Sequence, residues 1–315
     1  MVPNPPDPGA GNLDAGGVPI EAGLSSGEHA RERIRHQIRR LGTLQAEVLA
    51  DRDPEPLHQL RVSLRRLRTV LIQFAPALVL PEGVSERRIA SLGRRTGLCR
   101  DLDVLRLRLE QQLLPKLPQE ERQSLGGALK RLDRDRSQAF ASLTEALRGA
   151  RYLKLLERLH KWQKRPRFTP LGERPLLLWL ADWQAPFTAG LFLDPGWLEE
   201  DPEAETLHGL RKRIKAARYA LEHLEPWCGS GLKAWLQDLR QAQDHLGELH
   251  DLQVLQRTLA ESERLRRACL PVLQAELMIQ QRQHWQQWRE HAGRLHQDGE
   301  RRAIQRQLLE LGRSC

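Results

Sequence analysis

The segment HQLRVSLRRLRTVL, residues 58–71, has two helical stripes running side by side. An apolar stripe recurs at intervals of three and four residues through Leu57, Leu60, Leu64, Leu67 and Leu71. A cationic stripe follows the same rhythm through His58, Arg61, Arg65 and Arg68, and the segment contains no Asp or Glu. Such spacing predicts an amphipathic helix whose polar face is a basic row about 15 Å long.

A second copy of this pattern, HGLRKRIKAARYAL, occupies residues 208–221. The basic row recurs there as His208, Arg211, Lys215 and Arg218. A shorter pair, GLCRDLDVL from Gly97 and GELHDLQVL from Gly247, aligns at the same offset of 150 residues. Two agreeing registers predict two related halves, residues 28–171 and 172–315, packed around a pseudo-twofold axis.

The rest of the chain from Glu28 onward has the same helical periodicity and no strand-like alternation. Proline and glycine interrupt it at 54–56, at 81, and within 113–118, 164–175, 193–197 and 226–231. Short connections between long helices favour antiparallel packing. The fold class expected is therefore all-α. Residues 1–27 are rich in Pro and Gly and are expected to form a flexible tail.

Composition limits the functions that this chain can have. A formal net charge of +9 and a pI near 9.9 favour an acidic partner such as nucleic acid, an anionic membrane or a phosphate polymer. The four cysteines are widely spaced, which favours a reducing cytoplasm and no zinc site. There is no run of eighteen apolar residues and no secretory signal pattern, so we expect no spanning helix.

Arginine suits phosphate because its planar fork can bond two oxygens, and lysine adds a point charge. Like charges spaced along one helix face repel one another, which indicates that an anion belongs there. Further candidate cations are Arg35, Arg39, Arg94 and Arg100, while Asp101 and Asp251 could hold the arginines in place. A solvated basic face is the alternative for these residues, and a capping or core role is the alternative for the two histidines.

The paired HxLRxxxRxxR segments, each followed by xDLxVL, resemble the CHAD family of α-helical domains. The resemblance implies two four-helix halves around a basic central cavity that binds inorganic polyphosphate without catalysis or a cofactor. It also implies polyphosphate-metabolising enzymes as partners and a place in the cytoplasm near polyphosphate granules. Its motif residues here are His58, Arg61, Arg65, Arg68, Arg100, Asp101, His208, Arg211, Lys215 and Arg218. Ala216, Ala217 and His250 depart from the pattern, which predicts weaker binding by the second row.

Two other functions stay open at this point. RNA or DNA could use the same cations, although aromatics form only 5% of the chain and most Trp lie outside the basic rows. The dipeptide His250–Asp251 could belong to a metal-dependent phosphohydrolase, with His208 and His245 assisting. The chain has no phosphate loop, HExxH or GxSxG motif, and its basic faces adjoin core leucines, which argues against membrane binding.

Overall fold

The computed structural model describes residues 23–261 and 270–311, and these are predominantly helical. The described part of the first half contains α1 (Ser26–Ala50), α2 (Glu55–Gln73), α3 (Glu86–Arg95), α4 (Gly97–Leu107), α5 (Gln119–Arg148) and α6 (Ala150–Lys164). That of the second contains α7 (Leu180–Phe192), α8 (Glu205–His223), α9 (Ser230–Ala260), α11 (Pro271–Leu295) and α12 (Asp298–Leu309). No β-strand occurs within the described ranges, so the all-α prediction is confirmed.

Short 3₁₀ turns and one π-helical segment join these helices. The 3₁₀ turns are η1 (Ala75–Ala77), η3 (Leu114–Lys116), η4 (Leu176–Trp179), η5 (Pro195–Leu198) and η6 (Glu225–Trp227), and the π-helix is η2 (Arg108–Leu113). The interruptions expected at proline and glycine fall between helices, within these short segments or at helix ends, as with Pro56 at the start of α2 and Gly231 at the start of α9. Two further breaks, at Thr96 between α3 and α4 and at Gly149 between α5 and α6, had no proline to signal them.

The apolar stripe of the opening segment is buried as expected. On α2, its members Leu57, Leu60, Leu64, Leu67 and Leu71 are each at most 3% exposed. The matching positions of α8, among them Leu210, Ile214 and Leu221, are fully buried. Burying each such side chain contributes about 1.5–3 kcal/mol, so this stripe fixes how both helices face the core.

The first helix begins two residues earlier than the sequence predicted. Ser26 and Gly27 lie in α1 and are buried, because Ser25 caps the helix through its Oγ, which accepts a hydrogen bond from the Glu28 amide at 3.2 Å. Gly27 packs against the Phe168 ring, where a Cβ would come within 2.5 Å of Cγ. The expected tail therefore ends before Ser26, and residues 1–22 of that tail lie outside the described residues.

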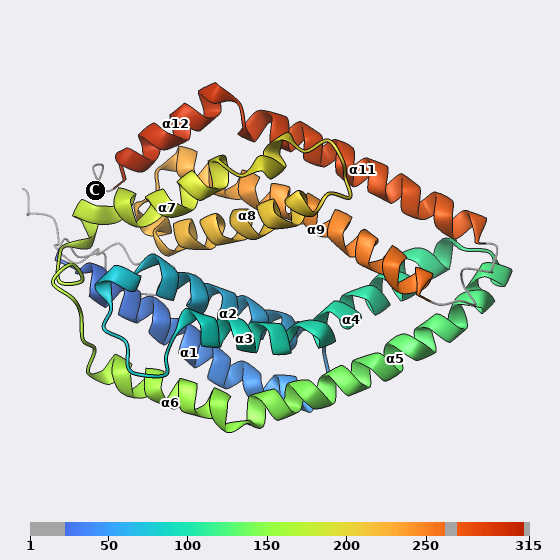
Figure 1. Cartoon of the computed structure of the whole chain (residues 1–315), viewed down its shortest axis with the longest axis horizontal. Helices are drawn as coiled ribbons and strands as arrows, with labels where there is room; N and C mark the ends of the chain where they lie inside the picture. Colours follow the sequence, from blue (N-terminus) through green and yellow to red (C-terminus); the bar gives the residue numbers. More distant parts are fainter. Residues whose placement is uncertain (1–22, 262–269, 312–315) are drawn as a thin grey trace, which may run out of the picture.

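The two halves lie face to face, with α2 and α8 in the middle and α5 and α11 along the outer edges (Figure 1). α2 and α8 begin and end at corresponding repeat positions and pack against each other. Gln73 and His223, also 150 residues apart, are joined at 2.8 Å between Oε1 and Nδ1. Repeat-equivalent residues thus meet between the halves, while the pseudo-twofold relation and the four-helix grouping stay predictions.

Several polar contacts hold the halves together away from α2 and α8. The Glu121 carboxylate of α5 accepts hydrogen bonds from the amides of Val272 and Leu273 at 2.9 and 2.8 Å, so it caps the start of α11. The buried Arg108 guanidinium pairs with Glu248 of α9. These contacts fix the position of α9 and α11 relative to the first half.

One described segment, Leu176–Leu198, is long and apolar enough by composition to cross a membrane. It comprises η4, α7 and η5 and is interrupted by Asp182 and Asp194. Buried side chains of α7, including Trp183 and Leu191, pack into the common core. Core packing thus accounts for part of the apolar character of this segment, whereas Leu178, Leu193 and Leu198 are exposed.

Candidate anion-binding cleft

A cleft of about 540 Å³ lies between the two repeat helices. The first half contributes cations from α2 and α3, and the second half contributes cations from α8. Its cationic lining consists of Arg61, Arg65, Arg68, Arg94, Arg211, Lys212 and Lys215, joined by His208. Asp101 is the one carboxylate among the described lining residues. We call this the basic cleft.

Two cations on the first-half side are held by the protein: Arg68, whose Nε donates to Glu86 Oε2 at 2.8 Å, and the more buried Arg61. Arg61 Nη1 donates to the Gly93 carbonyl at 3.1 Å, and its Nη2 lies 3.7 Å from Asp101 Oδ1, as the sequence suggested for that aspartate. Gly97 leaves space for it, since a Cβ there would lie 3.0 Å from Arg61 Nη1. Burial, reinforced by Arg65, lowers the pKa of Arg61 to about 10, which still leaves it charged near neutrality.

On the second-half side of the basic cleft, the cations have fewer carboxylates beside them. Arg211 forms no ion pair with any described carboxylate, and its Nε is buried without a hydrogen-bond partner. Burial lowers the pKa of Arg211, and burial with repulsion from Arg211 and Arg65 lowers the pKa of Lys215 to about 6. Burial raises the pKa of Asp251, which lies too far from Arg211 for an ion pair. Arg211 therefore gives the cleft a positive charge that no described carboxylate pairs with, whereas Lys215 is mostly neutral near pH 7.

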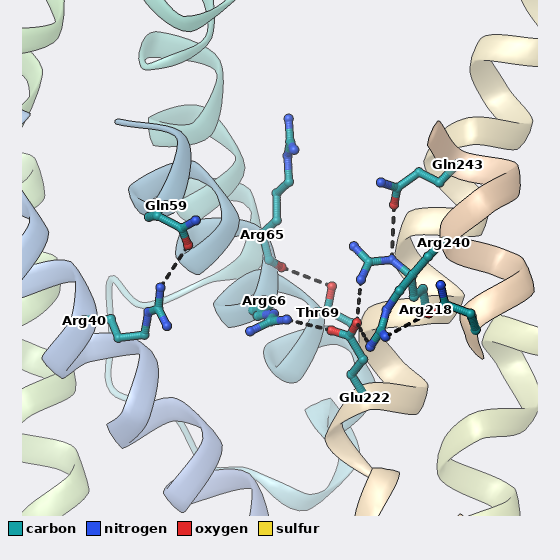
Figure 2. Close-up of polar contacts among 10 residues, drawn as sticks. Arg40, Gln59, Arg65, Arg66, Thr69, Arg218, Glu222, Arg240 and Gln243 are labelled. Carbon is teal, nitrogen blue, oxygen red and sulfur yellow. Dashed lines mark hydrogen bonds and ion pairs between the residues drawn. The ribbon is translucent and has the colours of Figure 1, made fainter. Parts of the chain in front are cut away.

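Arg65 points away from the ion pairs that join the two helices (Figure 2). Its guanidinium forms no hydrogen bond or ion pair with a described residue. The neighbouring Arg66 instead donates to Glu222 Oε2 of α8 at 2.9 Å, across the boundary between the halves. Of two adjacent arginines, one thus joins the halves and the other is available to a ligand.

Arg218 does not line the basic cleft. Its guanidinium pairs with Glu222, and its Nε donates to Gln243 Oε1 at 3.2 Å (Figure 2). The Glu222 carboxylate also accepts from Arg240 at 3.2 Å. Arg218 is buried, and these contacts give it a structural role at the α2–α8 boundary.

The other predicted residues also lie away from the basic cleft. Arg35 pairs with Glu32 on α1 at 2.5 Å, and Arg39 is an exposed residue of the same helix. Arg100 lines a separate hollow beside Asp103 and Asp133. Burial and the nearby Arg100 lower the pKa of His58, which is half-buried beside α4. The structure thus groups seven of the twelve predicted residues: Arg61, Arg65, Arg68, Arg94, His208, Arg211 and Lys215.

Sequence reasoning missed Lys212, an exposed lysine of the cleft wall. Its position, four residues after His208 and three before Lys215, follows the helical spacing and could have revealed it. It also missed Glu222, although Glu222 lies four residues after Arg218, a common spacing for a helical ion pair. Lys212 adds to the ligand-facing charge, whereas Glu222 removes Arg218 from it.

The chemistry of this arrangement is that of anion binding. Among the described residues, no group of three or more His, Cys, Asp and Glu side chains is arranged to hold a metal ion. His250 lies against His208, with ring centroids 4.6 Å apart, and burial and Arg211 lower its pKa to about 4. Guanidinium and ammonium groups from both halves converge on one open space, where a polyanion can bond several at once.

Comparison with known proteins agrees with this architecture. No curated protein matches the chain. The solved CHAD domain from the plant Ricinus communis is similar, with a TM-score of 0.63 and 24% identity over 96% of this chain and 98% of that one. PptA from Streptomyces chartreusis has a TM-score of 0.58 and 19% identity over 86% of this chain and 98% of PptA. The CHAD domain family profile matches residues 32–260. Since that match covers most of the sequence, the chain belongs to the CHAD domain family.

Proposed function

We propose that this protein binds inorganic polyphosphate in the basic cleft, as a non-catalytic binding module. The observation that carries the proposal is the composition of the cleft lining, which has seven basic side chains and a single carboxylate. Arg65, Arg211 and Lys215 have no ion-pair partner among the described residues. A chain that carries charge on every unit offers each of them an oxygen. Its negative charge relieves the repulsion between the two arginines and favours the protonated form of Lys215.

The geometry favours a polymer of phosphate over a single phosphate ion. The cations come from α2, α3 and α8, so one small ion cannot contact all of them. Arg61 to Arg68 alone extend about 10 Å along α2, at roughly 1.5 Å per residue. We therefore expect affinity to rise with chain length until the cleft is filled.

Nucleic acid is the second candidate, because it presents the same backbone charge. Proteins that bind single strands without sequence preference usually stack bases on aromatic side chains. No Trp, Tyr or Phe is among the described residues that line the basic cleft. Six of the eight tryptophans are buried in the core, as the sequence suggested, so they are unavailable for stacking. This composition favours a ligand without bases.

The metal-dependent phosphohydrolase has no observation in its favour among the described residues. A partner enzyme of polyphosphate metabolism and a location in the cytoplasm near polyphosphate granules belong to this proposal as expectations. The absence of membrane binding is an expectation of the same kind. A module that holds the polymer could act as a scaffold or a targeting adaptor for such an enzyme.

Substitution of the central cations tests the proposal. The variant carries Arg61→Gln, Arg65→Gln, Arg211→Gln and Lys215→Gln, and its binding of long-chain polyphosphate is measured by titration calorimetry. Each lost phosphate contact should lower the slope of log affinity against log salt by about one. We expect binding to fall at least a hundredfold, since several charge-assisted hydrogen bonds are lost together.

The control replaces the same number of basic side chains on the outer surface. Exposed positions of α5 supply them, in a variant with Arg122→Gln, Lys130→Gln, Arg134→Gln and Arg148→Gln. We expect this variant to keep the native affinity and nearly the native salt slope. Equal losses in both variants would show non-specific attraction to net charge and would contradict the proposal. Circular dichroism confirms that each variant is folded.

A further inference from the structure

A second hollow, of about 370 Å³, lies beside the basic cleft between the start of α8 and the middle of α9. His208 and Arg211 line both spaces. The two are therefore neighbours, separated by those two side chains. We call it the second-repeat hollow; His250, Gln253 and Arg257 of α9 form its far wall.

The second-repeat hollow has several polar groups without partners. His208 Nδ1 and Arg211 Nε are buried and form no hydrogen bond within the described chain. Arg257 is exposed and makes no ion pair with a described carboxylate. The carboxylates of the lining, Glu203 and Glu205, are exposed to solvent.

The charged groups that act most strongly on His250 are all cationic, in the order Arg211, His208, Lys215 and Arg257. Together with burial they keep the imidazole neutral near pH 7. The cations that stay charged near pH 7 are Arg211, whose Nε is buried without a partner, and Arg257, whereas the two carboxylates of the lining are exposed to solvent. The buried charge of the second-repeat hollow is therefore positive, so the space favours an anion.

The corresponding space in the first half, the first-repeat hollow, has a different charge balance. It measures about 490 Å³ and contains the carboxylates of Asp51, Asp53, Asp103, Glu110 and Asp133. Arg136 pairs with Asp51 and Asp103, and Arg106 pairs with Glu110 and Asp133. Two of its four arginines are thus paired, and its five carboxylates outnumber the arginines, which disfavours a polyanion.

The sequence explains this difference position by position. His250 stands where the first repeat has Arg100, and Gln253 stands where it has Asp103. Arg257 replaces Leu107. The second repeat has thus lost the carboxylate of Asp103 at the far wall and has exchanged the cation of Arg100 for that of Arg257. The loss of the carboxylate favours a negatively charged occupant.

We propose that a polyphosphate chain held in the basic cleft leaves it on one side only, passing His208 and Arg211 into the second-repeat hollow, where His250 and Arg257 bind its next phosphates. This inference rests on the proposed function and adds a second subsite and a direction to it. Chains short enough to fit the basic cleft do not need the subsite. Longer chains extend into it and gain affinity there.

The test compares two ligands, tripolyphosphate and long-chain polyphosphate, on a variant with His250→Gln and Arg257→Gln. Long-chain affinity should fall about tenfold and the salt slope by about one, as expected for the loss of one charged phosphate contact. Tripolyphosphate affinity should stay unchanged. The matched control is Arg52→Gln, which removes one exposed charge from the first-repeat hollow and should affect neither ligand.

Failure of this inference is distinct from failure of the proposed function. If the native protein binds neither ligand, the proposed function is wrong. If the native protein binds long chains and the double variant binds them equally well with the same salt slope, the second-repeat subsite is wrong and the proposed function stands. If the double variant loses the same affinity for both ligands, the proposed extension into the second-repeat hollow is also wrong. The same holds if Arg52→Gln loses as much long-chain affinity as the double variant. Arg257→Gln alone, at an exposed position, repeats the test if the double variant is unstable.

Discussion

Replacement of Lys215 by Met should make the protein more stable while it weakens the binding of polyphosphate. Lys215 is half-buried in the basic cleft between Arg65 and Arg211, and burial with their repulsion lowers its pKa to about 6. In the unfolded chain the same amine titrates near 10.4. At a pH between these two pKa values, the unfolded state binds a proton that the folded state does not. Folding must release this proton, which lowers the free energy of unfolding.

The size of the effect follows from this difference. At pH 7 the linkage relation gives an upper bound of about 5 kcal/mol for the stability that the native protein loses through Lys215. Solvent that reaches the half-buried side chain makes the actual loss smaller. We expect Lys215→Met to raise the free energy of unfolding by about 2 kcal/mol at pH 7. The gain should be largest near pH 6 and should disappear as the pH approaches 10, because the penalty exists only while the unfolded amine is charged.

Urea unfolding of the native protein and the variant at pH 6, 7 and 9 measures this gain. Lys212→Met is the control, since Lys212 lines the same cleft from the same helix but is exposed; it should show no gain that depends on pH. A destabilised Lys215→Met variant, or a gain that is equal at pH 6 and pH 9, would refute the reasoning. It would mean that Lys215 is charged and compensated in the folded protein.

Three further predictions concern the ligand and the contacts between the halves. Polyphosphate should raise the pKa of Lys215, so calorimetry at pH 7.5 in two buffers of different ionisation enthalpy should show uptake of up to one proton. Affinity should fall as the pH rises from 6 to 8.5, and a native protein that takes up no more protons than Lys215→Met would contradict this. Glu222→Gln should lower the free energy of unfolding by about 3 kcal/mol, because it leaves three arginines around a neutral amide. The control Glu82→Gln, at an exposed position, should change the free energy of unfolding little. A loss of stability no larger than that of Glu82→Gln would be inconsistent with a structural role for Glu222. Glu121→Ala should cost about 1–2 kcal/mol and speed hydrogen exchange at the first amides of α11, and unchanged exchange there would show that the cap is not needed.

The sequence was sufficient to predict α2 and α8 and much of the basic cleft. Each helix has a clear apolar stripe, and its cations must lie on the adjacent face once that stripe is buried. Arg61 and Arg211 therefore emerge from equivalent positions, and both line the cleft. Because the relevant spacing is local, helical periodicity alone was enough to find these residues.

The environments of equivalent residues could not be predicted in the same way. Arg68 is exposed and pairs with Glu86, whereas Arg218 is buried and pairs with Glu222. The repeat position of Glu222 is occupied by Ile72 in the first half, so only one of the two arginines finds a carboxylate on its own helix. Whether a cation of the repeat is paired within the protein or available to a ligand thus depends on the residue four positions further along its helix and on tertiary contacts.

Helix breaks show the same limit. Thr96 ends α3 without a proline, and its Oγ1 donates to the Gly93 carbonyl at 3.1 Å, while the equivalent stretch of the second half continues through α9. Gly149 separates α5 from α6 with an extended backbone conformation in a stretch whose periodicity had suggested continuity. The break at Thr96 separates α3 from α4, and both of these helices contribute residues to the lining of the basic cleft.

Direct competition between polyphosphate and RNA tests the central claim most sharply. Labelled long-chain polyphosphate is bound to the native protein at about 0.15 M salt, and single-stranded RNA with the same number of phosphates is added as competitor. The basic cleft has no aromatic ring on which a base could stack, so we expect it to select the ligand with the higher charge density. RNA should therefore displace the labelled polyphosphate only in at least tenfold excess. Unlabelled polyphosphate should displace the labelled polyphosphate at equal concentration. If RNA displaces the label as well as polyphosphate does, the basic cleft is a nucleic-acid site and the proposed function is wrong.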